Sequence, residues 1–482
     1  MRIPPAELVR LLGPWRNAGS AVPTALANSL SGLILDGRLP VGTRLPAERI
    51  MADVLHISRA SVVAALNQLR SRDLLSTRHG AGSLVRLPPH TALASVTAWT
   101  AAGGTPGAAH VHDEIDWSAA TPPAASPAIL RAYEQALTRL PFAGTGYSAA
   151  GLPELRTAIA DRYTSSGLDT SPDQICVTAG AQQALSLLLE QAVQGRGRVL
   201  LETPTYPGFL DLLRARPAQL TCVPVEDTWS MSALTDGLRD PTVQLAYLMP
   251  RLHNPTSQTM SDEQQESVCE AAARSGALII LDDTLADLTE QGGSGPLATH
   301  RAARLVRVGS LSKTAWGGLR VGWVRSDRAT AQLLARARTR VDLGTPVLEQ
   351  LAATAVLAQY DDVLHSRRQQ LHAAAARLTS ALAERIPTLT VPSAPAGPSL
   401  WCRLPTGISS TAITAAAHHR GLRLTDVARF SPHNLLSSAL RLPLDIPEHA
   451  LATAVDRLAL ALDDCAHRSG GRRQSPRGGA RR

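Results

Sequence analysis

One segment of the chain reads Val308-Gly309-Ser310-Leu311-Ser312-Lys313-Thr314-Ala315-Trp316-Gly317-Gly318-Leu319-Arg320, and it holds the only lysine in 482 residues. Lysine and arginine together number 48, so the other 47 basic residues are arginine. On a solvated surface a guanidinium can replace an ammonium at little cost, but only a primary amine can lose a proton and attack a carbonyl carbon. We therefore predict a chemical role for Lys313.

The alternative explanation is that a coding bias removed the other lysines and left Lys313 by chance. The residues around Lys313 argue against this alternative. Small hydroxyl residues and glycines flank Lys313 on both sides, and Arg320 follows it. This combination is typical of a lysine that forms a Schiff base beside a phosphate-binding cup. It points to pyridoxal 5′-phosphate (PLP) as a cofactor.

Length and composition are those of an ordinary globular chain. The length allows roughly three domains, and 44% hydrophobic residues suffice for a large core. A net charge of +8 permits contact with a polyanion without proving it. We expect reduced core thiols and no metal site, because the five cysteines are scattered without metal-ligand spacing. Neither a secretory signal nor a bilayer-length apolar run is visible, so a cytoplasmic protein without membrane contact is expected.

The N-terminal part has the pattern of a winged helix-turn-helix. Apolar residues at helical spacing predict three helices, over Thr24–Asp36, Pro46–Leu55 and Ser58–Arg72. Two short strands, about Leu75–Arg78 and Ser83–Arg86, are joined by a glycine-bearing turn. In such a module the third helix lies in the major groove and the wing holds phosphates, so double-stranded operator DNA is the expected partner.

This head closely resembles the DNA-binding domain of the GntR family. The segments that carry the resemblance are Gly37–Arg49, Ile57–Val62 and Arg78–Ser83. The DNA contacts that it implies are Arg49, Arg59 and Ser61, with Arg78 and Gly80 in the wing. Ser58, the expected N-cap of the third helix, should face the same groove. For any single arginine, the alternative is a solvated surface charge.

Beyond the head, short apolar runs alternate with helical segments. Five runs predict strands: Gln174–Thr178, Val199–Glu202, Leu245–Met249, Ala277–Asp282 and Leu305–Ser310. Strands that alternate with helices favour a mainly parallel α/β sheet, which binds ligands at the carboxyl ends of its strands.

Chemically notable residues stand at these strand ends. The turn Gly180-Ala181-Gln182 opens a helix whose N–H groups could hold a phosphate, although such turns often only permit close packing. Tyr206 could stack on a pyridine ring or pack in the core, and Asn254 offers an amide donor. Asp282 ends a buried strand that would tolerate a carboxylate only beside a charged partner, such as a pyridinium nitrogen.

This order of residues resembles the fold-type I aminotransferases, and with the head it resembles the MocR/GabR subfamily of bacterial transcriptional regulators over nearly the whole chain. The resemblance implies a large domain with a mainly parallel sheet and a smaller α+β C-terminal domain. It implies a Schiff base at Lys313, Asp282 against the pyridine nitrogen and Tyr206 stacked on the ring. The other cofactor contacts implied are Gly180, Ala181, Gln182, Ser310, Ser312 and Arg320 around the phosphate, and Asn254 near the ring hydroxyl.

Two more positions concern partners, and one departs from the family pattern. Tyr147 matches a tyrosine that reaches the phosphate of a neighbouring subunit, so a homodimer is expected. Arg441 resembles the arginine that takes a substrate carboxylate, which implies a small amino-compound effector. Thr284 stands where the family commonly has a tyrosine that donates to the ring hydroxyl, and Ser257 replaces a glycine. We expect these changes to affect turnover more than cofactor binding.

The sequence thus predicts a PLP-dependent DNA-binding regulator that senses PLP, an amino compound, or both. A working aminotransferase that carries a DNA-binding head, and a sensor of PLP level alone that controls vitamin B6 supply, stay as alternatives. Ligand exchange at Lys313 could move the C-terminal part, roughly 345–466, over the cleft. The expected boundaries are 1–88 for the head with its N-terminal extension, 89–112 for a linker, 113–466 for the aminotransferase-like domain and 467–482 for a disordered basic tail.

Overall fold

The computed structural model describes residues 3–12, 15, 21–35, 39, 43–71, 74–78, 82–86, 114–122, 124–225, 227–289, 297, 304–392, 397–432 and 436–471. The chain divides into two compact units, Met1–Ala108 with Ala428–Leu436 and Ala109–Val427 with Ser437–Arg482. The linker expected over 89–112 lies outside the described residues. The last helix, Glu448–Gly471, overlaps the first residues of the basic tail that was expected over 467–482.

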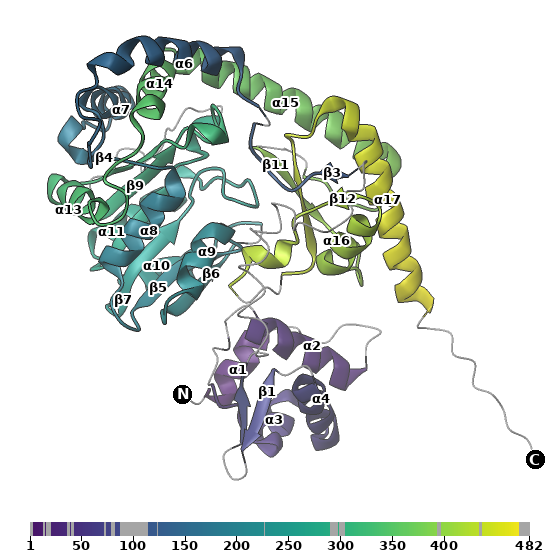
Figure 1. Ribbon diagram of the computed structural model, residues 1–482. Helices are drawn as coiled ribbons and strands as arrows, with labels where there is room; N and C mark the ends of the chain where they lie inside the picture. The colour runs from purple at the N-terminus through teal and green to yellow at the C-terminus, as the bar shows by residue number, and fades with distance from the viewer. Residues whose placement is uncertain are drawn as a thin grey trace, which may run out of the picture. The chain divides into compact units, whose positions relative to one another are not determined.

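The head is a bundle of helices with a hairpin (Figure 1). Its elements are α1 (Pro5–Leu12), α2 (Val22–Leu35), α3 (Glu48–Leu55), α4 (Arg59–Ser71), β1 (Leu75–Arg78) and β2 (Gly82–Val85). The two strands pair antiparallel. His56 adopts a left-handed conformation at the end of α3, and the Ser58 hydroxyl accepts from the Ser61 backbone N–H at 3.0 Å, so one helix ends and the next begins within a few residues.

Most of the apolar residues at helical spacing form the core of this head, but Ile50, which was expected on the buried face of the second predicted helix, is 37% exposed. Leu26, Leu30, Met51, Leu66 and Leu69 are all buried there. In the described part of the chain, no single helix is long and apolar enough to cross a membrane. Only α3 and α4 taken together reach that length and apolarity, and they are bent by 116°.

The second unit is built on a seven-stranded sheet in the order β4-β10-β9-β8-β7-β5-β6 (Figure 1). Its strands are β4 (Ile175–Thr178), β5 (Arg198–Thr203), β6 (Gln219–Pro224), β7 (Val243–Leu248), β8 (Leu278–Asp282), β9 (Leu305–Ser310) and β10 (Gly322–Arg325). All neighbours pair parallel except β10, which runs antiparallel to both β9 and β4. The five predicted strands are all present, and β6 and β10 are additions to them.

Helices cover both faces of this sheet. One face packs on α8 (Ala181–Ala192), α9 (Pro207–Arg214) and α13 (Arg328–Arg338). The other packs on α6 (Pro127–Arg139), α7 (Pro153–Ser165), α10 (Met231–Arg239), α11 (Asp262–Ala273) and α14 (Val347–Leu357). Because successive strand residues point to opposite faces, Tyr247, Ile280 and Val308 join the first core while Leu248 and Leu281 join the second.

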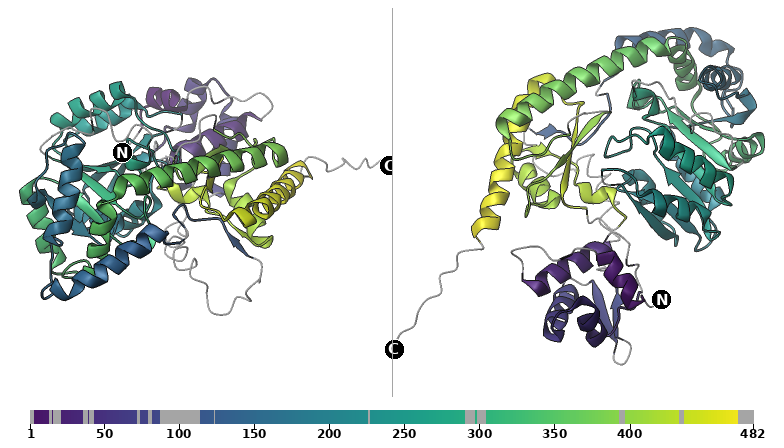
Figure 2. Two further views of the ribbon diagram at one scale, coloured as in Figure 1. Left: turned by 90° about the horizontal axis from the view of Figure 1, so that it is seen from above. Right: turned by 180° about the vertical axis from the view of Figure 1, so that it is seen from behind.

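A smaller α+β lobe completes this unit. Its elements are β3 (Ile115–Asp116), α15 (Tyr360–Arg385), β11 (Ser399–Arg403), α16 (Ser410–His419), β12 (Leu422–Arg423), β13 (Ala439–Pro443) and α17 (Glu448–Gly471). β11 pairs antiparallel with β13, and β12 pairs parallel with β3. The long helix α15 runs from the large lobe to the small lobe, where it packs beside α17 (Figures 1 and 2). The expected fold, a mainly parallel large domain with a smaller α+β domain, is confirmed.

Candidate functional site

Lys313 lies just after the carboxyl end of β9, at the edge of the sheet where ligands of parallel folds bind. Its Nζ donates to the backbone oxygen of Ala120 at 2.8 Å. The pKa of Lys313 is lowered to about 8, mainly by burial and with a contribution from the nearby Arg441 cation, while Asp445 acts in the opposite direction. At neutral pH this amine is therefore unprotonated much more often than an exposed lysine.

Asp282 ends β8 and is held by donors from two sides. Tyr247 donates its hydroxyl proton to Asp282 Oδ2 at 2.5 Å. Thr284 donates to Asp282 Oδ1 from its hydroxyl at 2.6 Å and from its backbone N–H at 3.0 Å. Burial raises the pKa of Asp282, and these hydrogen bonds offset part of the rise. The Thr284 hydroxyl is therefore directed at Asp282, and sequence reasoning missed Tyr247 altogether.

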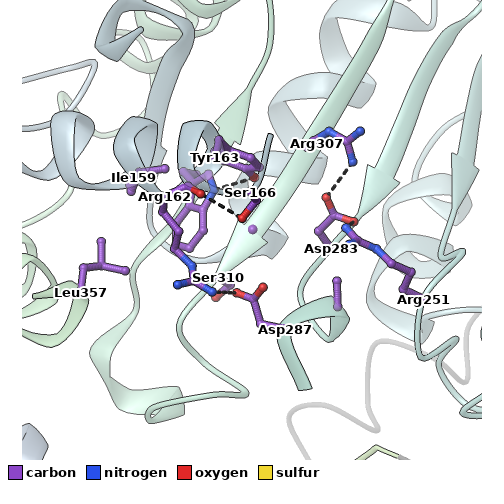
Figure 3. A pocket seen from close by; sticks show the side chains of 13 residues that line it. Ile159, Arg162, Tyr163, Ser166, Arg251, Asp283, Asp287, Arg307, Ser310 and Leu357 are labelled. Atoms are coloured by element: carbon purple, nitrogen blue, oxygen red, sulfur yellow. Dashed lines mark hydrogen bonds and ion pairs between the residues drawn. The ribbon is translucent and has the colours of Figure 1, made fainter. Parts of the chain in front are cut away.

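Asp283 anchors the backbone directly after Asp282 (Figure 3). Arg251 donates to Asp283 Oδ1 at 2.7 Å, and Arg307 donates to Oδ2 at 3.2 Å. Burial acts to raise the pKa of Asp283, but the two arginines outweigh it and the pKa is lowered. A polar pocket opens here, lined also by Arg162 and Tyr163 of α7. Because neighbouring strand residues alternate, this pocket faces away from the Asp282 side chain.

The residues expected around a phosphate meet at the start of α8. Gly180 precedes the helix with φ +81°, and a Cβ there would stand 3.0 Å from Arg320 Nη2. Arg320 donates to the Ala179 backbone oxygen at 2.9 Å. The Ser310 hydroxyl donates to Ser312 Oγ at 3.0 Å. The first N–H groups of α8 have no partner within the helix and can therefore donate to a ligand. Together with them, the serine hydroxyls and the Arg320 guanidinium provide donors for a phosphate.

Tyr206 and Gln182 lie beside this region. Tyr206 precedes α9, and a Cβ at Gly208 would stand 2.6 Å from its hydroxyl oxygen. Gln182 donates to the Gly208 backbone oxygen at 2.8 Å, which ties the starts of α8 and α9 together. Asn254 is half-buried in the loop after β7. That loop is closed by hydrogen bonds from His253 N to Gln258 O and from Ser257 N to His253 O.

Behind this loop lies a buried polar network that sequence reasoning did not find. Glu202 accepts from Trp229 Nε1 at 2.6 Å and from the Met249 backbone N–H at 2.7 Å. Burial raises the pKa of Glu202 to about 8 and lowers the pKa of His253 to about 3. Both groups are therefore predominantly neutral near pH 7. Their neutrality removes the penalty that a buried charge would carry.

Arg441 lies on β13 in the small lobe, and it is buried. Its Nε donates to Ser399 Oγ at 3.2 Å. Burial lowers the pKa of Arg441 to about 10, while Asp445 acts in the opposite direction. Arg367 of α15 pairs with Asp445 at 2.7 Å and donates to the Lys313 backbone oxygen at 3.3 Å. A buried cation thus lies within electrostatic reach of the Lys313 amine.

The remaining predicted positions are on the surface. Tyr147 is 77% exposed in the loop before α7. In the head, Arg49 is exposed, and Arg59 lies 3.2 Å from Glu48 Oε2. The hydroxyls of Ser58 and Ser61 are 2.8 Å apart at the start of α4. The Arg78 side chain and Gly80 lie outside the described residues. Among the residues that the structure describes, no group of three or more His, Cys, Asp or Glu side chains could hold a metal ion.

Comparison with known proteins assigns both parts of the chain. Residues 113–458 match the family model for aminotransferase class I and II, and residues 24–85 match that for bacterial regulatory proteins of the gntR family. The probable rhizopine catabolism regulatory protein MocR of Rhizobium meliloti is 28% identical over 443 residues, which are 86% of this chain and 88% of that protein. The uncharacterized HTH-type transcriptional regulator YisV of Bacillus subtilis is 26% identical over 396 residues, covering 74% and 78%.

Among solved structures, LysN, an alpha-aminoadipate aminotransferase from Thermus thermophilus, superimposes with a TM-score of 0.67 at 22% identity. It covers 76% of this chain and 99% of its own. At that identity the likeness concerns the fold. The match over 113–458 and the attached head decide the classification: the chain belongs to the aminotransferase class I and II family and, with its gntR-type domain, to the MocR/GabR subfamily of GntR-family transcriptional regulators.

Proposed function

We propose that this GntR-type DNA-binding regulator reads a small amino compound through its aminotransferase-like domain. The observation that carries the proposal is the only lysine of the chain, half-buried beside the sheet edge with a lowered pKa and near the Arg441 cation. An unprotonated amine and a cation for a carboxylate are what recognition of an amino acid on PLP requires.

PLP is the cofactor of this family, and the residues present fit it. At Gly180 a side chain would fill the space beside Arg320, so the glycine keeps the helix start open to a phosphate. Thr205 Oγ1 is buried without a hydrogen-bond partner among the described atoms, which leaves a polar group available at the same edge. When bound, the cofactor supplies an aldehyde that condenses with amines and a ring that withdraws electrons.

The chain's own residues divide the work of holding that group. We assign attachment to Lys313, the ring nitrogen to Asp282 and the ring face to Tyr206. We assign the phosphate to Gly180, Ala181, Gln182, Ser310, Ser312 and Arg320. Asn254 faces the ring hydroxyl in this assignment, with no help from Thr284, whose hydroxyl is directed at Asp282.

The effector is best matched by a compound with both an amine and a carboxylate. Arg441 is buried in the small lobe, and its charge already acts on Lys313. A bidentate pair between Arg441 and a ligand carboxylate would draw the small lobe onto the ligand. A sensor of PLP level alone would not need a carboxylate-binding cation near Lys313.

A homodimer is the form in which such a site is complete. Six apolar residues in and after α6 and after α13 are exposed, and we call them the interface patch: Leu137, Leu140, Phe142, Tyr147, Val341 and Leu343. Exposed apolar patches on a soluble protein often mark a site of contact with another protein chain. We assign the patch to a second copy, whose Tyr147 would approach the phosphate. Two heads would then read two half-sites of operator DNA in the cytoplasm.

The decisive experiment is a visible absorbance spectrum of the purified protein, titrated with candidate amines and amino acids. Wild type should show a visible cofactor band that amino acids change, and Lys313→Arg, which keeps the charge without the condensing amine, should not. A colourless wild type that takes up no PLP would refute the proposal. Operator affinity measured with and without the responding ligand should differ by about 5- to 150-fold.

A working aminotransferase is the second candidate. The match of residues 113–458 to the aminotransferase class I and II family model favours it. It predicts sustained conversion of an amino donor when a keto acid is supplied. The regulator predicts a slow or single half-reaction together with specific, salt-dependent DNA binding.

A further inference from the structure

Tyr247 donates a hydrogen bond to Asp282 from the neighbouring strand. It lies on β7 opposite Ile280 of β8, one strand away from Asp282. Its hydroxyl reaches Asp282 Oδ2 at 2.5 Å, and both side chains are buried. The ring of Phe209 packs on the Tyr247 ring at a centroid distance of 4.2 Å. This packing leaves the tyrosine little freedom to turn away from the carboxylate.

The hydrogen bonds to Asp282 can be counted against its lone pairs. Oδ1 accepts two bonds, both from Thr284, and each carboxylate oxygen offers about two acceptor sites. Oδ2 accepts one bond, from Tyr247, and so keeps one site. That remaining site is the one with which Asp282 can accept a further donor.

Burial and hydrogen bonding act in opposite directions on the pKa of Asp282. Burial favours its neutral form and raises the pKa of Asp282, while the bonds from Thr284 and Tyr247 favour the ionised form. Tyr247 stays a donor throughout, because burial and the Asp282 charge raise its pKa well above 10. Removing the tyrosine hydroxyl would therefore shift Asp282 toward its neutral state and leave Oδ2 without this restraint, while Thr284 still holds Oδ1.

We propose that Tyr247 is a positioning residue that keeps Asp282 ionised and turned so that Oδ2 faces the ring nitrogen of PLP, with Thr284 fixing the other oxygen. This rests on the proposed function, in which Asp282 holds that nitrogen. Thr284 is then part of the carboxylate clamp, which explains how a threonine can stand where the family commonly has a ring-hydroxyl donor.

Tyr247→Phe in the full-length protein tests this, because phenylalanine keeps the ring that packs on Phe209. We expect PLP to bind about 10- to 100-fold more weakly, the effect of losing a hydrogen bond to a charged group. The pH midpoint of the visible band should also move up. With Asp282 less ionised, the ring nitrogen keeps its proton less well, and without that positive charge a second positive charge near the ring is easier to hold. Tyr163→Phe removes a buried hydroxyl on the opposite face and should leave both quantities unchanged.

Two further variants separate positioning from packing. In an Asp282→Asn background, Tyr247→Phe should add no further loss of PLP affinity, whereas equal losses in both backgrounds would overturn the proposal. Thr284→Val should move the spectral midpoint in the same direction as Tyr247→Phe, which keeps the clamp testable if the tyrosine variant does not fold. An unchanged midpoint in both variants, with wild type still binding PLP at Lys313, refutes the clamp but not the proposed function. A wild type that binds no PLP refutes both.

Discussion

Burial and the neighbouring Arg441 cation lower the pKa of Lys313 to about 8. Only the unprotonated amine condenses with an aldehyde, so the rate of PLP uptake by cofactor-free protein should rise with pH through about 8. Stopped-flow measurement of the growing visible band across neutral and alkaline pH checks this. Arg441→Met should move the midpoint upward, because it removes a cation. A midpoint near the value of an exposed lysine would contradict the burial of the amine.

The same pKa shift predicts a pH-dependent stability. Native Lys313 loses its proton near pH 8 and an unfolded lysine near 10.5, so between these values the unfolded chain binds more protons. The free energy of unfolding therefore rises with pH across this window and is reduced below it. Relative to Lys313→Met, cofactor-free wild type should gain on the order of 1 to 3 kcal/mol between pH 8 and 10.5, discounted for partial exposure. Urea unfolding at the two ends measures it, and a flat difference would count against the shift.

Arg367 and Asp445 form a buried pair that should behave as a unit. Their side chains are 6% and 4% exposed and 2.7 Å apart. Arg367→Met leaves the Asp445 charge buried without that partner, so we expect a loss of about 3 to 5 kcal/mol in the free energy of unfolding. Adding Asp445→Leu should restore part of the loss. Denaturant unfolding of the single and double variants decides, and strictly additive losses would mean that the pair is not coupled.

At the scale of elements, the loop between β7 and α11 shows how a single departure from the family pattern is accommodated. Ser257 has φ +60°, a left-handed conformation that costs a side-chain-bearing residue about 1 to 2 kcal/mol. Its hydroxyl donates to the Ser399 backbone oxygen at 3.1 Å. That bond ties the loop of the large lobe to β11 of the small lobe. Ser257 therefore strains the backbone of the loop but forms a hydrogen bond that links the two lobes.

Substitutions at Ser257 should separate the two effects. Ser257→Ala keeps the strain and loses the bond, so it should lower the free energy of unfolding by about 1 kcal/mol. Ser257→Gly loses the bond but relieves the strain, so it should be the more stable of the two variants. Thermal melts of the three proteins give the order. An alanine variant at least as stable as the glycine variant would contradict the strain.

Most elements could be predicted from the sequence because their signals are local. The five short apolar runs correspond to β4, β5, β7, β8 and β9. The antiparallel strand β10 was missed, since Gly322-Trp323-Val324-Arg325 is short and opens with a glycine. That glycine has a tertiary reason, because a Cβ there would stand 2.6 Å from the Gly180 backbone. Close approach between distant segments leaves no periodic trace in a sequence.

Some residues of the candidate site stand out in the sequence, and others do not. Lys313 and Asp282 stand out locally, as a unique amine and as a charge at the end of an apolar strand. The clamp on Asp282 was not predictable, because Tyr247 reads as one more aromatic in a buried strand. Its role depends on the register between β7 and β8, which brings a residue 35 positions earlier within hydrogen-bond distance. Pairing of that kind becomes visible only in the folded sheet.

At the scale of the whole molecule, the interface patch should join two copies. Phe142 belongs to this patch, and it is 87% exposed. An aspartate there would have to be desolvated at the interface, so Phe142→Asp should convert dimer to monomer. Leu460→Asp, which changes a leucine that is 43% exposed on α17, is the matched control and should stay dimeric. Sedimentation velocity distinguishes the two forms.

Loss of the dimer should also weaken operator binding, because two linked heads bind paired half-sites more tightly than one by about 100- to 10,000-fold. Phe142→Asp should therefore bind a two-half-site operator no better than a single half-site, and its affinity should depend less steeply on salt because fewer phosphates are neutralised. PLP affinity should fall as well, since Tyr147 would no longer approach a partner's phosphate. A Phe142→Asp protein that remains dimeric, or a monomer that keeps full operator affinity, would show that the patch does not couple the two heads.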